Sequence, residues 1–159
     1  MYDFRIEARE VGVMYKDLAL ALEGLIAGET DAIANMANCA ALIWETLPDL
    51  NWAGFYRNVD GELVLGPFQG RPACIRIAFG SGVCGVAAET RTIQRVDDVN
   101  EFAGHIACDQ ASASELVVPL IRDGALLGVL DLDSPSRGRF TETDEAGCAR
   151  LAAILAAGL

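Results

Sequence analysis

The segment "GHIACDQASASE", residues 104–115, places the chain's single histidine three residues before a cysteine. Cys108 is followed by aspartate, glutamine and serine rather than by the apolar neighbours that usually surround a structural cysteine. A cysteine reacts as its thiolate, which a nearby cation or backbone N–H donors favour. His105 could supply that cation, although a lone histidine also serves to anchor a loop, and the adjacent Asp109 carboxylate raises a thiol pKa. We interpret Cys108 as a candidate for a reactive rather than a structural thiol.

The other four cysteines are of two kinds. Cys39 and Cys148 lie among apolar residues with helical spacing, where a thiol packs as a small hydrophobic group, so we predict both to be structural. Cys74 follows the turn "GRPA", and Cys84 lies in the glycine-rich "GSGVCGV". We expect Cys84 to begin a short helix, "CGVAAET", whose positive dipole end would favour its thiolate. With Cys108, these two thiols are candidates for redox chemistry.

Two other kinds of site fit the sequence poorly. Zinc sites use closely spaced Cys and His ligands, whereas this chain has no C-x-x-C pair, so we predict neither a metal nor another cofactor. Gly80, Gly82 and Gly85 form a G-x-G-x-x-G pattern after a strand-like segment, as in a dinucleotide fingerprint. A Rossmann unit, however, needs a long crossover helix and a parallel strand, and neither is indicated here.

Two aspartates end the apolar segment "LLGVLDLDS". Asp131 and Asp133 are two residues apart, so in a strand they face the same side of the sheet. A three-residue turn over 122–124 would pair Glu115 with Asp131 on that face, whereas a two-residue turn would put it on the other, and Pro119 introduces an edge or a bulge. In the first register the three carboxylates form an acidic cluster that suits an ammonium group and could supply a proton. The alternative is a solvated strand end.

The remaining pattern indicates the elements that position these side chains. Apolar residues recur with helical spacing over 11–25 and 33–47, and a capping-box pattern at Thr141 and Asp144 introduces a closing helix. Between them lie short segments rich in β-branched and aromatic residues, the last two joined by the hairpin dipeptide "DG". This order indicates an α+β fold with helices on a mostly antiparallel sheet.

Composition limits the class of protein. The 159 residues are 52% hydrophobic, and no linker-like segment divides residues 1–159, so we expect one domain. A net charge of -11 repels nucleic-acid phosphates and anionic membranes, and neither is an expected partner. The charged N-terminus "MYDFRIEAREV" is unlike a signal peptide, and no apolar run is long enough to cross a membrane. We therefore expect a cytoplasmic protein.

Five segments carry a more specific similarity: "NWAGFY", "LVLGPFQGRPAC", "GSGVCG", "DDVNEFAGHIACDQASASELVVP" and "GVLDLDSP". Together they resemble the free methionine-R-sulfoxide reductases, which are single GAF domains, and the similarity extends over nearly the whole chain. The resemblance implies a six-stranded antiparallel sheet flanked by N- and C-terminal helices. It also implies reduction of the free R epimer of methionine sulfoxide to L-methionine, with thioredoxin as the electron donor. Members of the family are often dimers, so a homodimer is compatible with it.

The resemblance further implies roles for the thiols. Cys108 corresponds to the nucleophile, Cys74 to the main resolving thiol and Cys84 to an accessory thiol. In that chemistry a thiolate attacks the sulfoxide sulfur, a cysteine sulfenic acid forms, and a second thiol converts it to a disulfide that an external dithiol reduces.

It also implies a substrate site. Glu115, Asp131 and Asp133 fall on the polar positions, and Trp52 and Tyr56 on an aromatic wall near the substrate methyl group. A free amino acid needs partners for both its ammonium and its carboxylate, so a closed acidic cavity with backbone donors is expected.

Two other functions remain open at this level. A GAF domain can bind a small ligand without catalysis and signal through its terminal helices. A redox-sensing module could use the pair Cys74 and Cys108 without any sulfoxide substrate. A ligand sensor does not need three thiols at these positions, whereas the redox-sensing module stays an alternative to the reductase.

Overall fold

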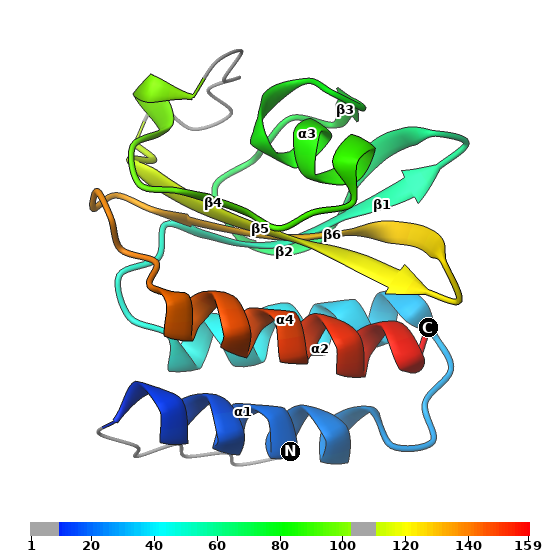
Figure 1. The fold of residues 1–159 in the computed structure, drawn as a ribbon. Coiled ribbons are helices and arrows are strands. Elements are labelled where there is room, and N and C mark those ends of the chain that lie inside the picture. The colour runs from blue at the N-terminus through cyan, green and yellow to red at the C-terminus, as the bar shows by residue number, and fades with distance from the viewer. Residues whose placement is uncertain (1–9, 103–110) are drawn as a thin grey trace.

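Helices at both ends of the chain enclose a run of strands, which confirms the predicted α+β fold (Figure 1). The computed structural model describes residues 10–102 and 111–159. The elements within them are α1 Val11–Ile26, α2 Ala32–Thr46, β1 Trp52–Val59, β2 Glu62–Gly70, β3 Arg76–Ala78, α3 Gly82–Thr90, β4 Gln94–Val96, the 3-10 helix η1 Val99–Glu101, β5 Ser114–Arg122, β6 Ala125–Ser134 and α4 Glu142–Ala157.

The helices lie in layers on the two faces of the sheet. α2 and α4 cover one face, α1 packs outside them, and α3 lies on the opposite face (Figure 1). The main hydrophobic core fills the space between the sheet and the three long helices, and it includes Cys39 and Cys148. Both thiols are buried, as predicted for structural cysteines.

The predicted capping box at the last helix is confirmed. The Thr141 hydroxyl accepts a hydrogen bond from the Asp144 N–H, and the Asp144 carboxylate accepts one from the Thr141 N–H at 2.8 Å. Two backbone donors that the first turn of a helix would leave unpaired are thereby satisfied. α4 is thus held in a defined position against the sheet.

The sheet is antiparallel throughout, in the order β3-β2-β1-β6-β5-β4. Successive residues of a strand face opposite sides, so the sequence alternation divides each central strand between two cores. In β5, Leu116 and Leu120 join the helical core, whereas Val117 joins a second core beneath α3. Glu115 is two residues before Val117 and therefore faces α3 as well.

Neither register predicted for the β5–β6 hairpin is correct. The turn has two residues, Asp123 and Gly124, both with positive φ (51° and 79°), which is the geometry of a tight hairpin turn. A register shift follows at once, because Leu120 pairs with Gly128 while Ile121 pairs with Leu126. This bulge adds one residue to β6 and returns its carboxylates to the face of Glu115.

As a result, Glu115 pairs with Asp133 rather than with Asp131, which lies opposite Val117. Pro119 pairs with Val129 and is not the bulged residue. β4 pairs only with Glu115–Val117, so Pro119 lies beyond the end of that neighbour, where β5 behaves as an edge.

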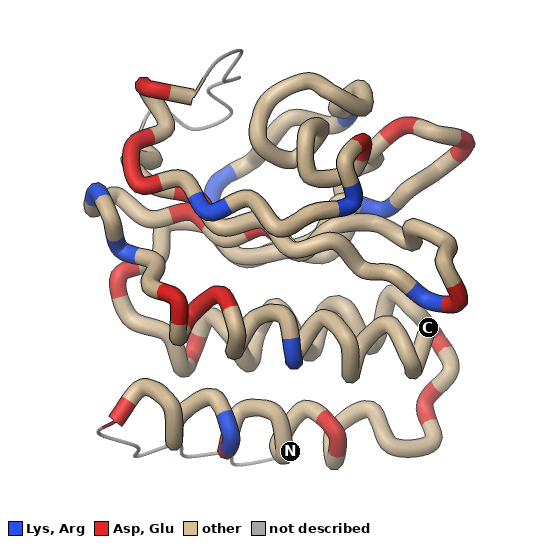
Figure 2. The backbone as a smooth tube through the Cα atoms, viewed as in Figure 1, with Lys and Arg blue, Asp and Glu red and all other residues tan. Residues whose placement is uncertain are grey.

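Acidic residues are spread over the helices and over the sheet side of the molecule, and the basic residues are scattered among them (Figure 2).

None of the helices in residues 10–102 and 111–159 combines the length and the apolar character needed to cross a membrane.

Candidate active site

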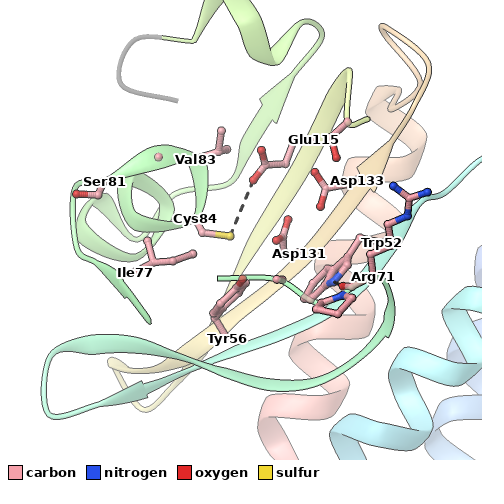
Figure 3. Close-up of a pocket in the computed structure, with 14 residues that line it drawn as sticks. Trp52, Tyr56, Arg71, Ile77, Ser81, Val83, Cys84, Glu115, Asp131 and Asp133 are labelled. Carbon is pink, nitrogen blue, oxygen red and sulfur yellow. Dashed lines mark hydrogen bonds between the residues drawn. The ribbon is translucent and has the colours of Figure 1, made fainter. Parts of the chain in front are cut away.

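A cavity lies on the α3 side of the sheet, where β1, β5 and β6 face the first turn of that helix (Figure 3). It encloses about 40 Å³, which is room for a few water molecules or part of one small ligand. Six of the eight residues singled out from the sequence line it: Trp52, Tyr56, Cys84, Glu115, Asp131 and Asp133.

Carboxylates and a thiol converge on one side of this cavity. Glu115 comes from β5, Asp131 and Asp133 come from β6, and Cys84 reaches them from α3 (Figure 3). The Cys84 thiol donates to Oε1 of Glu115 at 3.9 Å. The Oδ1 atom of Asp131 is buried and accepts no hydrogen bond. A buried acceptor without a donor is costly, so this atom is available to a ligand.

The same crowding favours the protonated carboxyl groups. Burial raises the pKa of Glu115 well above its usual value, and the charges of Asp131 and Asp133 raise it further. Burial also raises the pKa of Asp131, with the Asp133 charge as the second cause. The sequence predicted at least one raised pKa in this cluster, and that prediction is confirmed. A carboxyl that keeps its proton near neutral pH can serve as a general acid.

Cys84 differs from its predicted setting. α3 begins at Gly82, with Ser81 as the N-cap, so Cys84 is its third residue rather than its first. Its thiol is buried, and burial together with the charges of Asp131 and Glu115 raises its pKa well above the usual value. Desolvation and two neighbouring anions therefore outweigh the helix dipole, and the expected stabilisation of a Cys84 thiolate is wrong.

An aromatic wall forms the opposite side. Trp52 stacks on Tyr56 with ring centroids 5.8 Å apart and on Phe68 at 5.2 Å. The Trp52 indole N–H donates to the Arg71 carbonyl at 3.1 Å, and the Tyr56 hydroxyl donates to the Cys74 carbonyl at 3.1 Å. The stacked rings and these two bonds hold the segment between β2 and β3 against the cavity.

Cys74 lies in that segment directly after Ala73, which lines the cavity, and is half-buried against the second core. It is disulfide-bonded, whereas Cys39, Cys84 and Cys148 are free thiols. Cys108 and His105 lie outside the described residues, so the position predicted for the nucleophile is not described.

The glycine pattern at the start of α3 has a packing explanation at Gly85. A side chain at Gly85 would collide with the Ala78 carbonyl of β3, so only glycine lets the helix approach the strand so closely. The first-turn N–H groups of α3 have no partner within the helix, and the Ser81 side chain does not cap them. Because Ser81, Gly82 and Val83 line the cavity, these donors can receive an anionic group.

Sequence reasoning missed several lining residues, among them Arg71, Ser81 and Ser112. Arg71 lies in the "QGRPA" segment and brings a cation to an otherwise acidic site, but nothing in its local sequence marks it as part of the cavity. Its place depends on how the β2–β3 segment folds over the sheet.

The chain is similar to proteins of known family along most of its length. A family model described as GAF domain matches residues 34–159. The free methionine-R-sulfoxide reductase of Escherichia coli is 53% identical over 141 residues, which are 89% of this chain and 86% of that protein. The one from Saccharomyces cerevisiae is 44% identical over 148 residues, 88% of this chain and 82% of that protein.

Solved structures agree with these relatives. The X-ray structure of free methionine-R-sulfoxide reductase from Neisseria meningitidis, in complex with its substrate, has a TM-score of 0.96 and 42% sequence identity. The match covers 99% of this chain and 95% of that one. With its acid-lined, aromatic-walled cavity on a six-stranded sheet, the chain belongs to the GAF domain family and, within it, to the free methionine-R-sulfoxide reductases.

Proposed function

We propose that this chain reduces free L-methionine-R-sulfoxide to L-methionine through a cysteine sulfenic acid and a disulfide that thioredoxin recycles. The observation that carries the proposal is a buried carboxyl cluster with raised pKa values, set across one cavity from an aromatic wall. Sulfoxide reduction needs both a proton donor for the departing oxygen and an apolar surface for the methyl group.

The lining residues have matching partners for each end of the substrate. The ammonium group lies near the carboxylates of Glu115, Asp131 and Asp133, and the Trp52 and Tyr56 rings pack against the methyl group. The substrate carboxylate lies at the first turn of α3, where the N–H groups are not capped by a side chain. A peptide-bound methionine sulfoxide has neither free end and would bind poorly.

The reaction assigns a different task to each thiol. The Cys108 thiolate attacks the sulfoxide sulfur, a buried carboxyl protonates the oxygen, and the oxygen is transferred to cysteine sulfur as sulfenic acid while methionine leaves. The Cys74 thiol then displaces water from that sulfenic acid and closes a disulfide. One observation supports this division: Cys74 is disulfide-bonded, as a resolving thiol is after turnover, whereas Cys84 is free.

Cys84 then has the accessory role, because its raised pKa leaves little of the reactive thiolate at neutral pH. We propose further that residues 1–159 act as one domain, since α1 shares the core of α2 and α4. Thioredoxin supplies two electrons per cycle to the disulfide, and a homodimer of such domains is compatible with this scheme.

A single-turnover experiment without reductant tests the proposal. Cys108→Ser is expected to form no methionine, because no nucleophile remains, whereas Cys74→Ser forms one equivalent and then stops. Each variant is compared with wild type using the R epimer, the S epimer and a peptide containing the sulfoxide, with methionine measured directly. Equal methionine yields from Cys108→Ser and wild type would reassign the nucleophile.

The same experiment separates the reductase from a redox-sensing module. Such a module would exchange its disulfide with thioredoxin and yet form no methionine from either epimer. The expected result for the reductase is methionine from the free R epimer, with little from the S epimer or the peptide.

A further inference from the structure

Three side chains that could bind a metal ion meet inside the cavity. The Cys84 sulfur and one carboxylate oxygen each from Glu115 and Asp131 all lie within 4.8 Å of one another, and all three residues are buried. They come from α3, β5 and β6, which hold them from three directions (Figure 3). Within residues 10–102 and 111–159, no other group of three such side chains lies close enough together to hold a metal ion.

A second observation points to a ligand at this place. The Oδ1 atom of Asp131 is buried without a hydrogen-bond partner, on a side chain that is 6% exposed. Asp133 lines the same space and adds a third carboxylate. The Asp131 Oδ1 acceptor therefore lies among carboxylates, and Arg71, the cation that lines the cavity, is an exposed residue at its margin.

We propose that Cys84, Glu115 and Asp131 form a binding site for a thiophilic divalent cation, with Zn²⁺ as the ion of best-matched chemistry. Zn²⁺ takes thiolate at about 2.3 Å and carboxylate oxygen at about 2.0 to 2.2 Å, usually with four ligands in a tetrahedron. One thiolate and two carboxylates fill three positions and leave the fourth open to water or to Asp133. Ca²⁺ and Mg²⁺ prefer six or more oxygen ligands, which the thiol does not offer.

Binding has a chemical cost that the geometry must offset. The Cys84 thiol and any protonated carboxyl must release their protons before the ion can bind. The ligand atoms must also move closer together, since the present separations exceed those around a tetrahedral zinc ion by up to about an ångström. This cost is offset because the two positive charges of the ion pair with a buried carboxylate cluster.

The ion would occupy the space proposed for the substrate ammonium group. Zn²⁺ is therefore an inhibitor that competes with methionine sulfoxide and binds without Cys74 or Cys108. This competition rests on the proposed function, whereas binding of the ion itself does not. The two claims can fail separately.

The test uses the full chain in its oxidised form, where the Cys74 disulfide is closed and that thiol cannot bind metal. Cd²⁺ is titrated while the ultraviolet thiolate-to-cadmium absorption is recorded, and Zn²⁺ binding is measured by calorimetry. We expect one ion per chain. Cys84→Ser should abolish the absorption band, and Asp131→Asn should weaken binding of both ions by about tenfold or more.

Cys39→Ala is the matched control, because Cys39 is also a buried free thiol but has no carboxylate among the groups that shift its pKa. It should leave the absorption band and the affinity unchanged. A band that survives in Cys84→Ser, or the absence of saturable binding in the wild type, would overturn the proposal. Thermal unfolding of each variant checks that it is folded.

Competition is measured last. Free methionine sulfoxide of the R epimer should lower the apparent affinity for Zn²⁺, and the S epimer should do so less. Zinc binding that depends on Cys84 but is indifferent to both epimers would support the metal site and contradict the substrate position instead.

Discussion

Two buried carboxylates on opposite faces of the sheet have opposite surroundings. Asp144 is 2% exposed and lies in the first turn of α4, beside the helical core, whereas Asp131 is 6% exposed and lies in β6 beneath α3. Each has a buried cysteine nearby, Cys148 in one case and Cys84 in the other. Asp144 and Asp131 therefore differ in their surroundings rather than in residue type or in depth of burial.

Asp144 has a full set of partners. It accepts hydrogen bonds from the Thr141 backbone and hydroxyl at 2.8 and 2.7 Å, from the Tyr15 hydroxyl at 2.9 Å and from the Arg139 guanidinium at 3.1 Å. Burial alone would raise its pKa, but these donors lower it overall. Its charge is stabilised by the fold, and in return it joins α1, α4 and the segment before α4.

Asp131 has an acceptor without a donor, and its neighbours include two further carboxylates. Burial and the Asp133 charge raise its pKa, so the native state favours the protonated form. Satisfied buried carboxylates stabilise a fold, whereas unsatisfied ones reduce stability and persist where a ligand completes them. The face of the sheet that packs against α2 and α4 therefore serves the stability of the fold, whereas the face beneath α3 carries the groups that can react.

The largest expected difference is in activity. Asp131→Asn should lower kcat/KM for the free R epimer by about a thousandfold, because the side chain can no longer carry or release a proton or pair with the ammonium group. Asp144→Asn should leave kcat/KM of the folded protein within about twofold, since it touches no part of the cavity. Steady-state assays with thioredoxin measure both. Comparable losses in the two variants would remove the functional contrast.

Stability should respond in the opposite sense. Asp144→Ala should lower the free energy of unfolding by about 3 kcal/mol, because it removes the helix cap and the buried carboxylate that Arg139 and the Tyr15 hydroxyl bind. Urea unfolding followed by circular dichroism measures the change, with Asp131→Ala as the matched variant. A smaller loss for Asp144→Ala than for Asp131→Ala would contradict the assignment of Asp144 to structure.

The smallest effect is a pH dependence of stability. The pKa values of Asp131 and Glu115 are raised in the folded state, so the native protein binds more protons than the unfolded chain. Stability is then complete below the unfolded pKa and declines as the pH rises through the folded one. Asp131→Asn should remove part of that decline and raise the free energy of unfolding by about 1 to 2 kcal/mol at alkaline pH.

At acid pH the same substitution should change little, because both carboxyls are then protonated in either state. Asp144, whose pKa is lowered, contributes in the reverse direction, and its stabilisation is lost as the pH falls. Unfolding curves at several pH values test this prediction. A gain for Asp131→Asn that is equal at all pH values would show that its cause is not the buried charge.

Local patterns in the sequence were sufficient to predict the helices and strands. They were also sufficient to predict the surroundings of Asp144, but not those of Asp131. Thr141 and Asp144 stand three residues apart before an apolar run, and a capping box depends only on such neighbours. The shared face of Asp131 and Asp133 could be predicted as well, because two residues of a strand that are two apart face the same side at any register.

The partner of Glu115 could not be predicted, since one residue of bulge in a hairpin exchanges the faces of a strand. Leu127, the extra residue, carries no local mark of this role. The environment of Cys84 was also mispredicted, because the helix dipole is visible in the sequence and the two carboxylates that approach from other strands are not.

By itself, then, the sequence determined which residue types are present, which local elements they form and which family they resemble, because these depend on neighbours along the chain. Only the tertiary structure decided that Cys84, Glu115 and Asp131 lie within 4.8 Å of one another and that Asp131 keeps an unpaired acceptor. Proximity between strands and helices depends on register, bulges and layer packing, and burial sets the dielectric in which their charges interact.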